Sequence, residues 1–243
     1  MEIEPNNVQV YIARRKCYDA LNQTEKVLGD HNKIVEIYTE EREKNPNNPW
    51  SYWNLSEYYS SINEKEELAK NSAKMAEALP GYSWAHAGCA NDHRAIKQYE
   101  KAIVSYAKAV ELEPRNLIFW FDFALCYEEA KEYVNAVRIY TKILEITPDN
   151  VYAYRARADH YNHNLKQYEK ALEDYIKAIE IEPSFSFTYK ARGGVYEKLN
   201  MTDKAEEDYD AATFCEIDEV THETALKAYC KEIFDNRWNK TSW

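Results

Sequence analysis

The chain has 243 residues, of which 45% are hydrophobic and 30% are charged, a composition typical of a folded protein rather than a disordered one. Its formal net charge is −11, from 31 basic and 42 acidic side chains. Nucleic-acid binding draws much of its affinity from neutralised phosphates, so this balance disfavours a nucleic-acid partner and favours basic protein partners. Only 5 glycines are present. So few glycines argue against phosphate-binding loops and tight β-hairpins, which need backbone with positive φ.

The cysteines and the first residues bear on the compartment. Five cysteines, an odd number with no CxxC pair, suit reduced thiols. The opening residues lack the basic and apolar regions of a signal peptide, and no run of 18 apolar residues is present. We therefore expect a cytoplasmic (intracellular, reducing) location and no membrane partner.

In chain order, residues 1–14 are expected to form a lead-in helix. Two degenerate helical repeats follow, at 15–48 and 49–82. The first keeps an apolar stripe of Tyr18, Leu21, Ile34 and Tyr38, and the second keeps Tyr52, Leu55, Tyr59 and Leu68. The boundaries come from the prolines. Pro46, Pro80, Pro114 and Pro148 are separated by 34 residues, and Pro183 follows after 35. Regular proline spacing in a glycine-poor chain marks a repeated helix end.

The repeat at 83–116 has a well-defined second helix, carrying Tyr99, Ala102, Tyr106 and Ala109. Its first helix fits two registers. The ungapped register places His86, Ala90 and His93 on the packing stripe, whereas a register shifted by two places Trp84 and Gly88 there. The periodicity leaves both registers open.

The repeat at 117–150 shows the pattern most clearly. Its first helix carries the stripe Trp120, Ala124 and Tyr127, and its second carries Tyr133, Ala136, Tyr140 and Ile143. Repeats at 151–185, with one extra residue after Tyr161, and at 186–219 follow the same pattern. Residues 220–236 are expected to form a capping helix with an apolar stripe, because the last repeat needs a cover with one polar side. Residues 237–243 are expected to form a tail.

This pattern resembles the tetratricopeptide repeat, in which an aromatic residue, a small residue and Tyr are followed by Ala, an aromatic residue, Ala and Pro. The resemblance covers 15–219, and it is strongest over 83–219. It implies an all-α fold, a right-handed α-solenoid of about six helix hairpins. It also implies a scaffold or adaptor whose first helices line a concave groove that binds a partner. No catalytic motif is found, so we expect no enzyme, no cofactor and no metal.

Helical geometry identifies the residues that face away from the packing stripe. The predicted groove consists of Trp53, Asn54, Glu57, Asn91, Phe121, Asp122, Arg155, Asp159 and Lys190. Trp50 and Trp84, near helix starts, are expected to pack instead. Aromatic and acidic residues in a groove predict a protein or peptide partner with apolar and basic residues.

Three alternatives bear on function. The carboxylate clamp of tetratricopeptide co-chaperones is disfavoured, because Asn54 matches one clamp position while Asp19 and Gln23 stand where Lys and Asn are needed. Self-association through grooves or ends stays open. A metal-dependent enzyme built on His86, Cys89 and His93, which are spaced to share a helix face, is weighed against ordinary packing, and packing is favoured.

Overall fold

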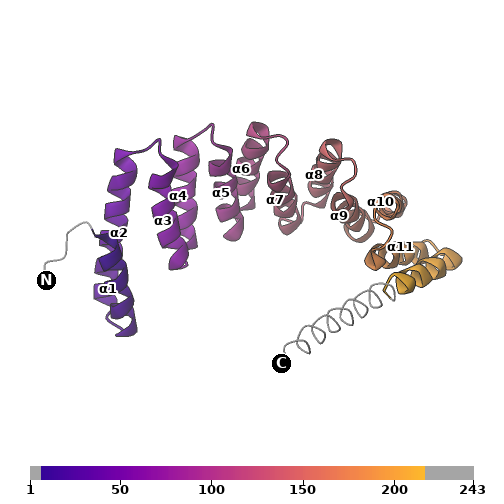
Figure 1. Ribbon diagram of the computed structural model, residues 1–243, viewed down its shortest axis with the longest axis horizontal. Helices are drawn as coiled ribbons and strands as arrows, with labels where there is room; N and C mark the ends of the chain where they lie inside the picture. Colours follow the sequence, from indigo (N-terminus) through magenta and orange to yellow (C-terminus); the bar gives the residue numbers. More distant parts are fainter. Residues whose placement is uncertain (1–6, 217–243) are drawn as a thin grey trace, which may run out of the picture. The chain divides into compact units, whose positions relative to one another are not determined.

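The structure, a computed structural model, describes residues 7–216, and within that range the regular structure is entirely helical. The helices are α1 (Val8–Ala20), α2 (Thr24–Lys44), α3 (Pro49–Ser61), α4 (Lys65–Ala78), α5 (Ser83–Ala95), α6 (Tyr99–Leu112), α7 (Leu117–Glu129), α8 (Tyr133–Ile146), α9 (Val151–Asp159), η1 (His160–Asn164), α10 (Tyr168–Ile181) and α11 (Ser186–Lys198) (Figure 1). Residues 202–216 form a further helix. The predicted all-α fold of helix hairpins is confirmed. The expected capping helix at 220–236 and the tail at 237–243 lie outside the described residues.

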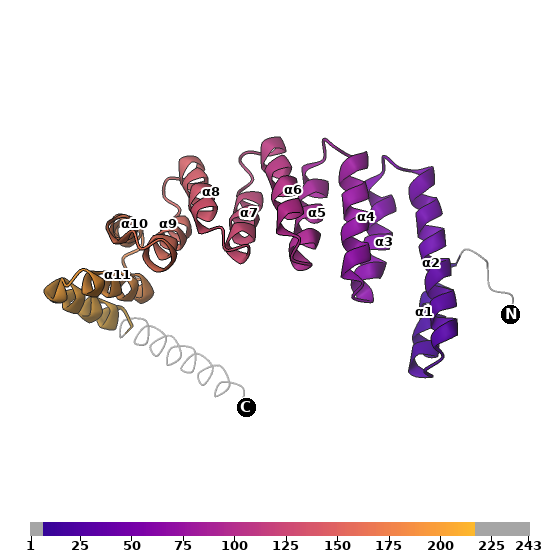
Figure 2. The ribbon, with the colours of Figure 1, turned by 180° about the vertical axis from the view of Figure 1, so that it is seen from behind.

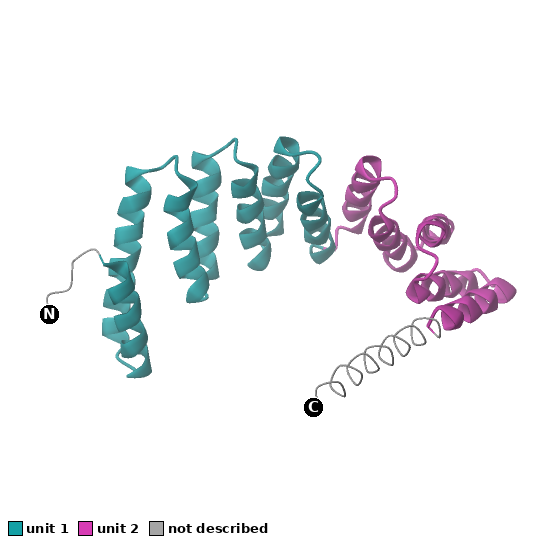
Figure 3. Cartoon of the chain, viewed as in Figure 1, with its two compact units in different colours: residues 1–130 teal, residues 131–243 magenta. Residues whose placement is uncertain are grey.

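The chain divides into two compact units, residues 1–130 and 131–243 (Figure 3). In unit 1, each helix packs on the next along the chain, and α5 also contacts α7. The helices α4 and α6 lie in one layer, in front of α3 and α5 in Figure 2. In unit 2, α9 packs between α8 and α10, and α10 packs on α11. Both units are therefore built from stacked helix hairpins.

Proline and asparagine set the ends of the helices. The five prolines predicted to mark helix ends each lie two residues beyond a second helix, as Pro114 does after α6. Asparagine side chains cap four of the first helices: the side-chain oxygen of Asn116, for example, accepts a hydrogen bond from the backbone N–H of Ile118 at 3.2 Å. These caps satisfy backbone groups that a helix end leaves unpaired.

The turn inside each hairpin contains one residue with positive φ, although none of these residues is glycine. The six residues are Asn22, Asn63, Lys97, Lys131, Lys166 and Asn200, with φ between 54° and 62°. At the end of α5 the backbone N–H of Gln98 donates to the carbonyl of His93 at 2.9 Å, and that of Lys97 donates to Arg94 at 2.9 Å. This is the Schellman arrangement that closes helix ends. The low glycine count therefore did not exclude positive φ.

The first hairpin differs from the boundaries expected from the sequence. Helix α1 begins at Val8 and crosses the expected border between residues 14 and 15, so no separate lead-in helix precedes it among the described residues. Helix α2 has 21 residues, whereas α4 has 14. Its additional first two turns pack on α1, where Asp30 is buried and accepts hydrogen bonds from Arg14. A count back from the prolines could not reveal this extension.

The register of the third hairpin is the ungapped one. Ala90 in α5 and Ala124 in α7, each the eighth residue of its helix, are completely buried. Small side chains at this position let the two helices of a hairpin approach closely, while rings such as that of Tyr106 fill the surrounding core. Over residues 7–216, no helix is both long and apolar enough to cross a membrane.

Candidate partner-binding site

Unit 1 contains an open cavity of about 650 Å³ between α3, α4, α5 and α7. One part of its lining is aromatic, formed by Trp50, Trp53, Tyr82, Trp84 and Phe119. Another part is acidic, formed by Glu57, Asp92 and Asp122. Among the described residues that line the cavity, none is basic. We call this feature the unit 1 cavity.

The aromatic rings of the cavity lie in edge-to-face pairs. The rings of Trp50 and Trp53 are 6.1 Å apart at 67°, and those of Trp84 and Phe119 are 4.8 Å apart at 75°. Phe119 is buried beneath this surface, whereas Trp53 keeps 58% of its area exposed. Rigid aromatic side chains with open faces are frequent binding hot spots.

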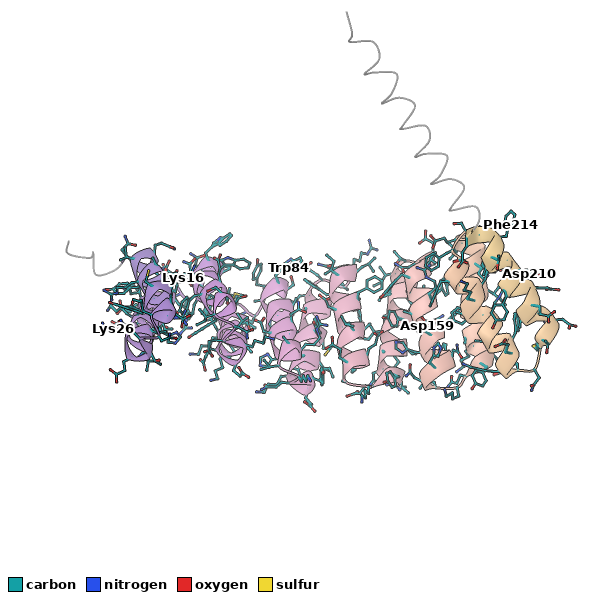
Figure 4. All side chains as sticks on the ribbon, turned by 90° about the horizontal axis from the view of Figure 1, so that it is seen from below. Lys16, Lys26, Trp84, Asp159, Asp210 and Phe214 are labelled. Carbon is teal, nitrogen blue, oxygen red and sulfur yellow. The ribbon has the colours of Figure 1, made fainter. Side chains whose placement is uncertain are left out.

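The expectation that Trp50 and Trp84 pack was wrong, because they are 69% and 48% exposed. Each is the second residue of a first helix, whereas the fourth residue of these helices lies on the packing stripe. Two residues correspond to a rotation of about 200° around the helix axis. Trp50 and Trp84 therefore point away from the hairpin core, and Figure 4 marks Trp84 on α5. The second residues of three other first helices are also exposed: Ile118, Tyr152 and Phe187.

Four of the predicted groove residues line the unit 1 cavity: Trp53, Glu57, Asn91 and Asp122. Two hydrogen bonds fix the side chain of Asn91: its oxygen accepts from the Tyr106 hydroxyl at 2.6 Å and from Arg94 at 3.3 Å. Asn54 and Phe121 do not line the cavity. Asn54 instead donates a hydrogen bond to Glu41 at 3.4 Å.

The other three predicted groove residues lie in unit 2, and each interacts with side chains of that unit. Arg155 forms an ion pair with Glu182 at 3.2 Å, and its guanidinium lies 4.0 Å above the ring of Phe185. Asp159 accepts a hydrogen bond from the Tyr175 hydroxyl at 2.5 Å. Lys190 forms an ion pair with Glu216.

Asp92, which the sequence analysis missed, lines the unit 1 cavity on α5. Burial raises the pKa of its carboxyl group, and a hydrogen bond with the Ser72 hydroxyl offsets part of that effect. The position of Asp92 within the repeat could have revealed it. Asp92 is the tenth residue of its helix, and the tenth residues of α3, α7 and α11 are the buried Tyr58, Cys126 and Val195.

The three residues weighed as metal ligands take other roles. His86 Nε2 donates to the carbonyl oxygen of Pro80 at 3.0 Å, as Trp120 Nε1 does to that of Pro114 at 2.9 Å. His93 Nδ1 lies 2.8 Å from the carbonyl oxygen of Cys89. Over residues 7–216, no three His, Cys, Asp or Glu side chains are grouped to hold a metal ion.

The helices and the cavity together define a helical-hairpin repeat protein with an open aromatic and acidic surface. The tetratricopeptide repeat family matches residues 93–159 and again residues 156–185. Residues 93–185 of the chain thus match tetratricopeptide repeats. Among curated proteins, none matches the sequence significantly.

Several solved structures share the fold. A crystal structure of MamA is 20% identical with a TM-score of 0.60, covering 71% of this chain and 93% of MamA. MamA from Desulfovibrio magneticus RS-1 is 17% identical with a TM-score of 0.56, covering 69% of this chain and 94% of that one. YrrB, described as a tetratricopeptide-repeat protein with an unusual peptide-binding site, is 20% identical with a TM-score of 0.57, covering 78% of this chain and 97% of YrrB. At these identities the likeness concerns the fold.

Proposed function

We propose that this protein is a scaffold or adaptor that binds a peptide or helix of a partner protein in the unit 1 cavity. The observation that carries the proposal is the lining itself, which combines five aromatic residues with three carboxylates and, among the described residues, no basic group. Aromatic faces offer contact area at low entropic cost, and the carboxylates favour a segment with basic residues. The peptide-binding site named for YrrB is consistent with a peptide ligand on this fold.

The shape of the cavity also supports a peptide ligand. The cavity is open to solvent and extends over four helices, and polar groups such as Ser56, Ser60 and Asn91 also line it. Such a surface suits a chain that lies across several helices and inserts individual side chains. We expect Trp53 to contact apolar side chains of the ligand, and Glu57 and Asp122 to face basic ones.

Selection from a random peptide library displayed on phage tests this proposal. The baits are the wild type and the double variant Trp53→Ala, Asp122→Lys, after circular dichroism has shown both to be folded. The wild type should enrich peptides that combine apolar and basic residues, and the variant should not enrich them. Enrichment of the same peptides by both baits, or of none by the wild type, would overturn the proposal.

Self-association is the second candidate, and the exposed rings of Tyr152 and Phe187 in unit 2 favour it. Light scattering over a range of protein concentrations distinguishes the two functions. A mass that stays at 28.7 kDa supports a monomeric adaptor. A dimer that the Phe187→Ala substitution dissociates supports self-association instead.

A further inference from the structure

The buried aspartates of this protein follow a common rule. Among residues 7–216, three are less than 6% exposed, and each forms an ion pair with an arginine from the first helix of its own hairpin: Asp30 with Arg14, Asp174 with Arg157, and Asp208 with Arg192. In each pair the arginine is the seventh residue of its helix. Since an unpaired buried carboxylate is costly, the arginine is what makes aspartate tolerable at these places.

Tyrosine rings lie around each of these arginines. The guanidinium carbon of Arg192 lies 5.7 Å from the ring of Tyr189 and 5.8 Å from that of Tyr196. Arg14 lies 5.2 Å and 5.9 Å from two rings, and Arg157 lies 5.7 Å from one. A guanidinium between aromatic faces and a carboxylate is therefore a recurring element of this chain.

Asp92 is a carboxylate without an arginine partner, and it stands on a first helix, whereas the aspartates of this element are each the seventh residue of a second helix. The carboxylate stands at a helix position that holds buried residues in α3, α7 and α11, and within the described residues it forms no ion pair. The seventh residue of its own helix is the buried Cys89, and the seventh residue of α6 is Ser105, whose hydroxyl donates to Cys89 Sγ at 3.5 Å, so this hairpin has no arginine and aspartate pair of its own. The aromatic residues Trp53 and Trp84 line the same cavity as Asp92. Lys65 lines a small adjoining cavity of about 130 Å³ together with Asp92 but makes no ion pair with it.

We propose that the unit 1 cavity is an arginine subsite, in which a guanidinium from the partner pairs with Asp92 and stacks on the tryptophan rings. The partner's arginine would meet the same kinds of group, a carboxylate and aromatic rings, that surround Arg14, Arg157 and Arg192 inside other hairpins. Arginine fits better than lysine because its planar, weakly hydrated head binds carboxylates through two hydrogen bonds and stacks on aromatic faces. Glu57 and Asp122 add negative charge to the same lining. The subsite rests on the proposed function and names the side chain that the cavity selects.

The experiment uses N-acetyl-arginine amide as the probe and the full chain labelled with ¹⁵N at tryptophan. N-acetyl-citrulline amide is the control ligand, because it has nearly the same shape and no charge. The indole N–H resonances of Trp53 and Trp84 should shift saturably with the arginine probe. The resonance of Trp120, whose indole donates to Pro114, should not move. We expect the citrulline probe to bind more weakly than the arginine probe by about tenfold or more.

Two matched variants test whether the arginine probe binds through the negative charge of Asp92. Asp92→Asn should weaken binding of the arginine probe by about tenfold or more. Asp19→Asn, the same change at an exposed position of α1, should leave binding unaltered. Equal binding of the two probes, an unaffected Asp92→Asn variant, or no saturable shift would each overturn the subsite. The citrulline comparison needs no variant, so it stands even if Asp92→Asn unfolds. Peptide selection that succeeds while the arginine test fails would leave the proposed function intact.

Discussion

Arg157 and Asp174 join the two helices of one hairpin through two parallel hydrogen bonds. Nε of Arg157 donates to one carboxylate oxygen and an Nη donates to the other, both at 2.7 Å. A third donation, at 2.9 Å, reaches the Thr141 hydroxyl on α8. Both charged side chains are largely buried, so the pair depends on all of these bonds to offset the cost of desolvation.

We predict that Asp174→Leu destabilises the protein by about 3 kcal/mol, because it leaves the Arg157 guanidinium buried without a counter-charge. The double variant Arg157→Met, Asp174→Leu should recover most of the loss. The measurement is urea unfolding followed by circular dichroism. As a control on the same helix, Glu180→Ala removes an exposed pair with Lys177 and should cost less than about 0.5 kcal/mol. A double variant no more stable than Asp174→Leu would contradict this account.

Lys97→Gly should stabilise the protein, because Lys97 adopts φ 61° in the turn between α5 and α6. A side chain is strained in this left-handed conformation and glycine is not, so we expect a gain of about 0.5–1 kcal/mol in the free energy of unfolding. Lys108→Gly, in the interior of α6, should instead lose about 1 kcal/mol. Urea unfolding of both variants checks the prediction, and a loss at Lys97 would refute it.

Binding of the arginine probe should depend on pH through Asp92. Burial raises the pKa of this carboxyl group, so the carboxylate form that pairs with a guanidinium persists above the raised pKa and is lost as pH falls through it. Affinity for N-acetyl-arginine amide should therefore be full at neutral pH and fall in the acidic range. The other titratable groups around this carboxylate are Glu57, His93, Asp122 and Lys65.

The control for this pH dependence is the Asp92→Asn variant, which keeps all of those other groups. Its residual affinity should change less with pH than that of the wild type over the same range, as measured by titration of the indole resonances. Parallel pH profiles for the two proteins would assign the effect to another carboxylate.

Sequence reasoning predicted the hairpin architecture because its signals are local and repeated. Prolines such as Pro114 end the helix that precedes them, and only small residues such as Ala124 fit where two helices pack closely. The additional turns of α2 have no such local sequence signal. They are stabilised by the ion pair between Arg14 on α1 and Asp30 on α2, which is a contact between two helices. The six left-handed turns were missed because asparagine and lysine, rather than glycine, occupy them.

The candidate site was predicted in part. Helical geometry selected Trp53, Glu57, Asn91 and Asp122, since the face opposite a packing stripe follows from position alone. The same geometry, applied to the second residue of each first helix, would have placed Trp50 in the site. Asp92 was missed because it lies near the packing stripe, where an acid is expected only if something else pairs with it.

Calorimetric titration of a selected peptide tests the central claim most directly, using two substitutions at the same repeat position. Trp50→Ala removes an exposed ring from the unit 1 cavity, and Phe187→Ala removes an exposed ring from unit 2. If the cavity is the binding site, Trp50→Ala should weaken the Kd by about tenfold or more and Phe187→Ala by less than about twofold. Equal losses, or a loss confined to Phe187→Ala, would contradict the account and place the binding surface elsewhere.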